Sequence, residues 1–411
     1  MKDHIDKYAR KLLRDRTAIP ESIRFYVLDD RVITNREDEW LSVFTEVFSG
    51  LNVTALLFAK TTLPFADFLI ARSEPGVERI MPKDTETTTF LHDIPFIRKN
   101  EWSESSPQER PGKIIRCLKE RRAMVIEGLG VVATGGVTVE QSFIAFSMIF
   151  HTTFVKYLLD LLTDGFKLPG EREAFKDFQS KWVRPIDSSG LQFTAGPLGY
   201  SAECGVPPHP GPLPRGAREV IYEEICRVGR YTVEKGLVDS FFGNISYFDG
   251  KTIYISQTAS SLDELEGHID PVPLDYSSTA GLSASSELPA HKAIYLSSNY
   301  HAVLHGHPKF SVILSMHCEE KGCDIENCGR NCRTKRYACG IPIVSGEIGA
   351  GGLAKTVPQA IRKTGSCIVY GHGVFSAGEK DFREAFMKMA DVENRCREEY
   401  FRLLKKKSSS E

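Results

Sequence analysis

Three histidines in two short segments have the residue type and the spacing of a metal site. His305 and His307 close an apolar run that predicts a strand, and side chains two residues apart on a strand point to the same face. His372 lies between two glycines, directly after another short apolar run. Three imidazoles leave one coordination position of a divalent ion open, as in catalytic zinc sites. The pattern favours such a site, although buried or surface histidines alone could also produce an H-x-H pair.

A carboxylate precedes these histidines in the chain. Glu287 follows Ser285 and Ser286 on a loop just before an expected helix, residues 288–296. One interpretation is structural, with Ser286 as the helix cap and Glu287 in the first turn. The other is chemical, because Glu287 could reach the ion or its substrate from this loop.

Four motifs in a fixed order resemble the class II aldolase and adducin family. They are Gly243-Asn244-Ile245-Ser246, then Ser285-Ser286-Glu287 with His291, then His305-Gly306-His307-Pro308, and then Gly371-His372-Gly373. The resemblance covers nearly all of residues 217–404. It implies a central antiparallel sheet flanked by helices, with an active site at a subunit interface.

The resemblance also implies a role for each matching residue. These are metal ligands (His305, His307 and His372), a general acid/base (Glu287) and holders of a substrate phosphate (Asn244, Thr258, Ser285 and Ser286). The implied ion is zinc or another divalent transition metal. Ala259 departs from the family, which usually has glycine there, and no lysine or arginine stands out in the motifs. An unphosphorylated substrate therefore stays open.

The implied function is a lyase that cleaves a short ketose or ketose phosphate by retro-aldol chemistry. A divalent ion polarises the ketose carbonyl and stabilises an enediolate, while Glu287 moves the proton. The same site also serves sugar-phosphate epimerases and dehydratases, and the family includes non-catalytic scaffolds of the adducin type. Glutamate at position 287 favours the aldolase over the epimerase, and the retained histidines argue against a scaffold.

A cysteine-rich insertion, residues 317–340, follows the H-x-H strand. Its cysteines are Cys318, Cys323, Cys328, Cys332 and Cys339. With lysines and arginines between them they cannot build a core, and they predict a second, structural zinc or iron–sulfur site. The spacing matches no standard pattern, so a loop of reduced thiols is the alternative.

The elements that position these residues fall into two expected domains. A chain of 411 residues is long for one core. Residues 191–216 contain five prolines within eight residues, which predicts an extended linker. Residues 217–411 form the expected catalytic domain, where strand-like and helical runs alternate, as in an α/β or α+β fold.

Residues 1–190 contain none of the four motifs but align with parts of the second domain. Leu129 aligns with His372 at an offset of 243 (372 minus 129), and residues 55–60 align with 302–307 at an offset of 247. Leucine, phenylalanine and lysine then replace the three ligand histidines, and none of these coordinates a cation. The alignment predicts a degenerate, metal-free copy of the fold in tandem with the catalytic one.

Composition predicts a cytoplasmic protein whose partners are small molecules. The net charge of −2 gives no basic field for nucleic acid, and the first residues include no apolar signal region. The most apolar stretch, residues 141–162, is interrupted by charged residues, which indicates a buried helix rather than a membrane span.

The resemblance finally implies an assembly. Family members typically build ring-like tetramers in which a neighbouring subunit completes each active site. A chain with two copies of the fold would supply half of such a ring, so we expect a homodimer that forms a pseudo-tetramer, or a larger homo-oligomer.

Overall fold

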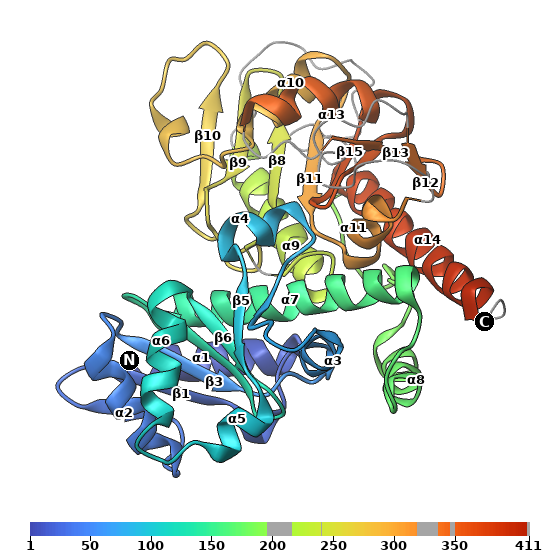
Figure 1. Ribbon diagram of the computed structural model, residues 1–411. Coiled ribbons are helices and arrows are strands. Elements are labelled where there is room, and N and C mark those ends of the chain that lie inside the picture. The colour runs from blue at the N-terminus through green and yellow to red at the C-terminus, as the bar shows by residue number, and fades with distance from the viewer. Residues whose placement is uncertain (195–215, 240, 319–335, 346–349, 409–411) are drawn as a thin grey trace. The chain divides into compact units, whose positions relative to one another are not determined.

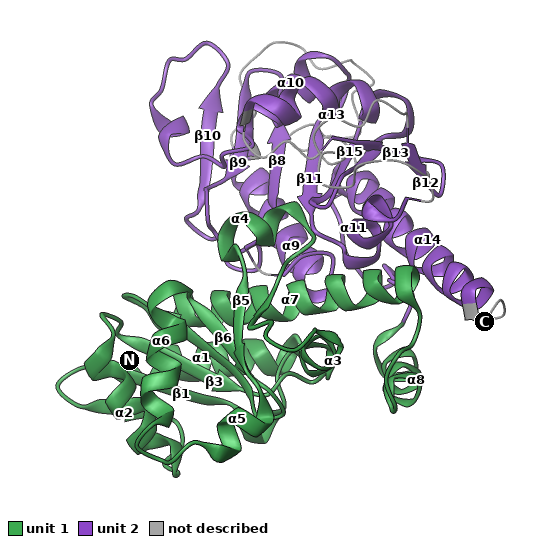
Figure 2. Cartoon of the chain, in the orientation of Figure 1, with its two compact units in different colours: residues 1–183 green, residues 184–411 purple. Residues whose placement is uncertain are grey.

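The structure is a computed structural model that describes residues 1–194, 216–239, 241–318, 336–345 and 350–408. The chain divides into two compact units, unit 1 (residues 1–183) and unit 2 (residues 184–411), as Figure 2 shows. Most of the predicted linker lies outside the described residues. Its first described residues belong to unit 2, where Thr194 donates hydrogen bonds to the buried carboxylate of Glu224.

Unit 1 is built on a seven-stranded sheet with the order β2-β1-β3-β7-β6-β5-β4 (Figure 1). Its strands are β1 (Arg24–Leu28), β2 (Val32–Thr34), β3 (Ala55–Ala59), β4 (Arg79–Ile80), β5 (Ile94–Ile97), β6 (Ala123–Ile126) and β7 (Gly130–Gly135). Its α-helices are α1 (Lys2–Arg14), α2 (Trp40–Gly50), α3 (Phe65–Arg72), α4 (Thr85–Leu91), α5 (Lys99–Glu104), α6 (Arg110–Glu120), α7 (Val139–Asp164) and α8 (Glu171–Trp182). Neighbouring strands are antiparallel except β5 and β6.

Unit 2 is built on an eight-stranded sheet with the order β10-β9-β8-β11-β15-β14-β13-β12. Its strands are β8 (Asn244–Phe248), β9 (Thr252–Ser256), β10 (Ile269–Pro273), β11 (Ala302–Gly306), β12 (Arg336–Ala338), β13 (Ile341–Val344), β14 (Ser366–Val369) and β15 (Gly373–Gly378). Its α-helices are α9 (Ala217–Glu234), α10 (Leu288–Leu296), α11 (Lys309–Met316), α13 (Ala350–Thr364) and α14 (Phe382–Ser408). The predicted central sheet, mainly antiparallel and flanked by helices, is confirmed.

The central strands of unit 2 direct alternate side chains to opposite faces of the sheet. Val303 of β11 and Phe375 of β15 lie in one apolar core with residues of α10 and α13. Side chains two apart on a strand share a face, so His305 points to the same side as Val303. The opposite face is covered in part by α14, which packs on β11 and β15. His305 is thereby placed on the side of α10, whose first turn follows Glu287.

Helix α7 is the apolar stretch singled out in the sequence. Its length and composition would allow it to cross a membrane, but 83% of its most apolar window is buried. The helix begins with a capping box in which Thr138 accepts a hydrogen bond from Gln141 N and Gln141 reaches back to the cap. It ends at Gly165, which has a φ of 72°. It is a core helix, as predicted.

The two sheets share their strand order and their pairing registers, apart from the additional edge strand β10. Phe58 lies opposite Val132 across β3 and β7, as His305 lies opposite Phe375 across β11 and β15. These pairs are related by offsets of 247 (305 minus 58) and 243 (375 minus 132). Both offsets equal those of the sequence alignment. The one parallel pair also recurs, as β5 with β6 and as β13 with β14.

Candidate metal centre

The three predicted ligands lie at one end of the central strand pair of unit 2. His305 is in β11 and His307 follows its last residue, while His372 is in the turn between β14 and β15. Gly371, which precedes His372, has a φ of 57° and so adopts the left-handed conformation that this tight turn requires. The histidines are 1%, 2% and 5% exposed, in chain order.

The imidazoles converge closely enough to share one ion. The Nε2 atoms of His305 and His307 are 3.1 Å apart, and the ring centroid of His372 is 5.0 Å from that of His305 and 4.8 Å from that of His307. Two nitrogen ligands of a tetrahedral zinc ion, each at about 2.0–2.1 Å, lie roughly 3.3–3.4 Å apart. Within the described part of the chain, no other group of three potential ligands comes this close together. The donor set fits a divalent transition metal.

Hydrogen bonding fixes which nitrogen of His305 faces this centre. Its Nδ1 lies 3.0 Å from the carbonyl oxygen of Val374, which only accepts, so Nδ1 carries the proton. Nε2 therefore presents its lone pair to the centre. Phe375 stacks on the same ring at a centroid distance of 4.1 Å. A backbone carbonyl on the far nitrogen is the usual partner of a metal-ligating histidine.

Glu287 occupies the cap position of α10 and directs its carboxylate at the histidines. Its Oε2 lies 3.5 Å from Nε2 of His305, and its Oε1 lies 3.6 Å from Nε2 of His372. The structural interpretation of this motif is wrong in detail. The cap residue is Glu287 rather than Ser286, and it makes no side-chain capping bond. Its side chain, 12% exposed, is directed to the metal centre.

Asn244 contacts Glu287 directly. Its Nδ2 donates to Glu287 Oε2 at 2.8 Å, and its Oδ1 lies 2.5 Å from Nε2 of His291. Burial lowers the pKa of His291 to about 3, so its ring is neutral. Tyr295, one helical turn beyond His291, extends the same network and was missed in the sequence. Its spacing of four and eight residues from His291 and Glu287 on one helix was the available signal.

The other expected phosphate holders lie on two adjoining loops. Thr258 is exposed, and its backbone N donates to Ser283 O at 2.9 Å. Ser285 is buried and its Oγ accepts from Glu287 N at 3.3 Å, whereas Ser286 is exposed. Ala259 has a φ of 58°, the left-handed conformation that favours the glycine usual in the family. The backbone hydrogen bond from Thr258 joins its loop to the loop that precedes Glu287.

A carboxylate from the last helix holds the segment that follows His307. Helix α11 begins one residue after Pro308, and Glu393 of α14 accepts hydrogen bonds from the backbone N of Phe310 at 2.8 Å and of Ser311 at 2.9 Å. Burial raises the pKa of Glu393. The side-chain oxygens accept from backbone N–H groups that the first turn of a helix leaves without a partner, which fixes the start of α11.

The cysteine-rich insertion is described only at its two ends. Cys323, Cys328 and Cys332 lie outside the described residues, so the second metal site stays a prediction. Cys318 and Cys339 are half-buried. A hydrogen bond with the thiol of Cys396 lowers the pKa of Cys339. This buried cysteine of α14 was not among the predicted ligands.

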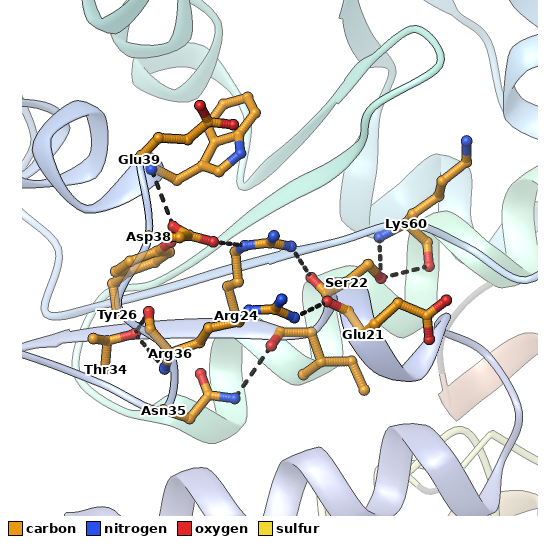
Figure 3. A network of polar contacts seen from close by, with 12 residues as sticks. Glu21, Ser22, Arg24, Tyr26, Thr34, Asn35, Arg36, Asp38, Glu39 and Lys60 are labelled. Carbon is orange, nitrogen blue, oxygen red and sulfur yellow. Dashed lines mark hydrogen bonds and ion pairs between the residues drawn. The ribbon is translucent and has the colours of Figure 1, made fainter.

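Unit 1 has different side chains at the positions that correspond to the metal centre. Phe58, in the register position of His305, packs against Trp40 at a centroid distance of 4.4 Å. Arg24, in the register position of Asn244, donates to Asp38, and Figure 3 shows Lys60 extending away from this pair. Lys60 Nζ instead donates to Gly128 O at 3.0 Å. Aromatic rings and paired charges thus occupy this region.

Comparisons with known proteins agree with the four motifs. Residues 223–400 match the family described as Class II Aldolase and Adducin N-terminal domain. Among solved structures, L-fuculose-1-phosphate aldolase from Thermus thermophilus is 24% identical, with 46% of this chain and 95% of that chain covered and a TM-score of 0.37. A sugar-phosphate aldolase from Thermotoga maritima is 20% identical, with 46% and 96% covered and a TM-score of 0.32.

YgbL from Escherichia coli, described as a putative aldolase/epimerase/decarboxylase, is 22% identical, with 43% of this chain and 86% of that chain covered and a TM-score of 0.35. The search of curated proteins gave no match. The family match extends from α9 into α14 and includes all four motifs. Residues 223–400 of unit 2 thus match the class II aldolase and adducin family.

Proposed function

We propose that unit 2 is a divalent-metal-dependent lyase that cleaves a short ketose or ketose phosphate by retro-aldol chemistry. The observation that carries the proposal is the position of Glu287, whose two carboxylate oxygens lie 3.5 Å and 3.6 Å from Nε2 atoms of two buried histidines. The family also includes non-enzymes. A scaffold has no use for a nearly buried carboxylate directed at three buried imidazoles, because burying such groups costs free energy.

Each residue of the site has a separate role in the proposed reaction. His305, His307 and His372 would hold the ion, which would supply Lewis-acid polarisation of a substrate carbonyl. Glu287 takes a proton from the substrate hydroxyl as the carbon–carbon bond breaks and returns it to the carbon that becomes the new methyl or methylene group. The loops of Ser285 and Thr258 receive the anionic or polar end of the substrate with hydroxyl and backbone donors.

A panel of short ketose phosphates and their unphosphorylated sugars tests this proposal. We expect the protein to bind one divalent ion per chain in unit 2 and to release an aldehyde from at least one substrate. Glu287→Gln should retain the ion and lose roughly 10²- to 10⁴-fold in turnover, because an amide does not accept the proton. His372→Ala should lose the ion itself.

Glu266→Gln is the matched control, because this glutamate is exposed on another part of unit 2. Epimerised or dehydrated products from the same panel would show that the enzyme is an epimerase or a dehydratase rather than an aldolase. Full ion occupancy without turnover of any substrate would favour a scaffold, and full ion content in His372→Ala would refute the ligand assignment.

We propose that unit 1 is a degenerate, metal-free copy of the unit 2 fold. The shared strand order and offsets support this, as do Phe58, Lys60 and Leu129 at the ligand positions. A cytoplasmic homodimer that forms a pseudo-tetramer follows from the proposal, with a larger homo-oligomer as the alternative. Sedimentation equilibrium of the full chain would distinguish them.

A further inference from the structure

A chain of buried hydrogen bonds runs from the carboxylate of Glu287 into the interior of unit 2. It continues from Asn244 to Nε2 of His291, and Nδ1 of His291 lies 2.6 Å from Ser246 Oγ. Ser246 Oγ in turn lies 2.6 Å from the hydroxyl of Tyr295. The four residues beyond Glu287 are between 0% and 6% exposed.

Two secondary-structure elements supply the four residues of this network beyond Glu287. Asn244 and Ser246 are alternate residues of β8 and share a face of the sheet. His291 and Tyr295 are four residues apart on α10 and share a face of the helix. The network therefore ties the helix that follows Glu287 to the strand that pairs with β11, the strand of His305.

The number of hydrogen atoms available decides which atom donates and which accepts at each step of this network. An ionised carboxylate only accepts, so Asn244 must present Nδ2 to Glu287 and Oδ1 to His291. The neutral ring of His291 must then carry its proton on Nε2, which leaves Nδ1 to accept from the hydroxyl of Ser246. The single proton of the Tyr295 hydroxyl is then directed at Ser246, whose Oγ and backbone carbonyl oxygen lie 2.6 Å and 2.9 Å from it. Each member has a partner in this arrangement.

We propose that His291 is a positioning residue that acts through Asn244 on Glu287, and that the amide of Asn244 orients the general base rather than serving only to bind substrate. The inference rests on the proposed lyase function of the site. Asn244 holds Oε2 of Glu287, which leaves Oε1 as the oxygen free to exchange a proton with substrate. His291 fixes the orientation of the amide, because a flipped Asn244 would present an N–H to an N–H.

Unit 1 provides an internal comparison. Arg24 and Tyr26 occupy the register positions of Asn244 and Ser246, since Arg24 pairs with Phe58 as Asn244 pairs with His305. Helix α2 of unit 1 is capped by Glu39, as α10 is capped by Glu287, but Val43 stands four residues after that cap. The side chains that orient Glu287 are thus replaced in the unit where the ligand histidines are replaced.

The first test measures the histidine directly and needs no activity. In the protein labelled with ¹⁵N-histidine, the ring of His291 should be a neutral Nε2–H tautomer between pH 5 and pH 9. Glu287→Leu should shift the ring ¹⁵N resonances of His291, because Asn244 loses its acceptor, whereas Glu266→Gln should leave them unchanged. An Nδ1–H tautomer, an imidazolium, or unchanged resonances in Glu287→Leu would overturn the proposal.

The second test is kinetic. His291→Leu should lower kcat roughly 10- to 100-fold with KM and metal content unchanged, since a displaced catalytic group costs about this much. His291→Gln keeps an N–H donor for Asn244 and should recover part of the loss. If His291→Leu does not fold, Ser246→Ala can be used instead, because it deletes only one oxygen atom, the donor to Nδ1 of His291. This variant should also lower kcat with KM and metal content unchanged.

A double-mutant cycle separates positioning from a structural role. In the Glu287→Gln background, His291→Leu should cause no further loss, because the base through which it acts is already absent. A control is Tyr300→Phe, which removes a buried 3.2 Å hydrogen bond to Ile361 O in the same core and should not change kcat. Equal losses in both backgrounds would refute the positioning role. A wild-type protein that cleaves no ketose but shows the expected His291 tautomer would refute the lyase function alone.

Discussion

Replacing Gly373 by alanine tests whether close packing of two strands builds the metal centre. A Cβ at this position would lie 2.3 Å from Gly306 O, 2.7 Å from His307 Cδ2 and 3.0 Å from His305 Cε1. The nearest atom is a backbone oxygen and cannot swing away. An ordinary contact begins at 3.4 Å, so the two strands must separate by about 1.1 Å (3.4 minus 2.3).

The expected cost follows from this clash. Overpacking of this kind typically costs about 1–3 kcal/mol. If the strands relieve it by moving the ligand histidines apart, affinity for the ion falls roughly 5- to 140-fold, since each 1.4 kcal/mol is about a factor of ten. Zinc titration against a competing chelator would measure the affinity, and urea denaturation of the metal-free protein would measure the stability.

Two alanine variants serve as controls. Gly351→Ala in α13 places a Cβ with nothing within 4 Å and should change neither quantity. Gly130→Ala, at the corresponding position of unit 1, places a Cβ 2.6 Å from Ala59 O, and should destabilise the protein without changing zinc affinity. Wild-type zinc affinity in Gly373→Ala would refute the reasoning.

Three further outcomes are expected. Glu171→Gln should destabilise unit 1 by about 3–5 kcal/mol in urea denaturation, because it breaks a buried pair with Arg72 whose side chains are 0% and 7% exposed. Burial favours the protonated form of Asp93, but hydrogen bonds from two arginines hold its pKa below the usual value. The contribution of Asp93 to the free energy of unfolding is therefore complete above about pH 4, and it is lost as the pH falls through the lowered pKa of the folded state. Asp93→Asn should remove this pH dependence. Iodoacetamide should modify Cys339 before Cys367, whose pKa burial raises to about 12, as peptide mass spectrometry would show.

The geometry of the three histidines was predictable because strand periodicity is local. His305 and His307 are two residues apart at the end of β11 and therefore share a side of the chain, and the Gly-His-Gly turn places His372 between β14 and β15. The partners of Asn244 were not predictable in this way. An amide side chain signals one donor and one acceptor group, but the residues that meet them, Glu287 and His291, are brought there by the packing of α10 on the sheet.

The fold of unit 1 shows which structural features could be predicted from the sequence and which could not. Two aligned segments gave the offsets 247 and 243, and the pairing of β3 with β7 and of β11 with β15 reproduces them. The order of the outer strands could not follow from those segments, because it depends on crossovers whose sequences have diverged. Trp40 against Phe58 likewise could not be foreseen, since periodicity assigns a face but no neighbour.

The hydrogen bonds from the start of α11 to Glu393 set a minimum length for any working fragment. The residues of the candidate metal centre begin at Asn244, whereas the carboxyl group that anchors the chain after His307 is supplied by residue 393. During translation, the start of α11 can be held in this way only after residue 393 has left the ribosome. A fragment that stops before residue 393 would lack these hydrogen bonds and is therefore expected to bind the ion more weakly.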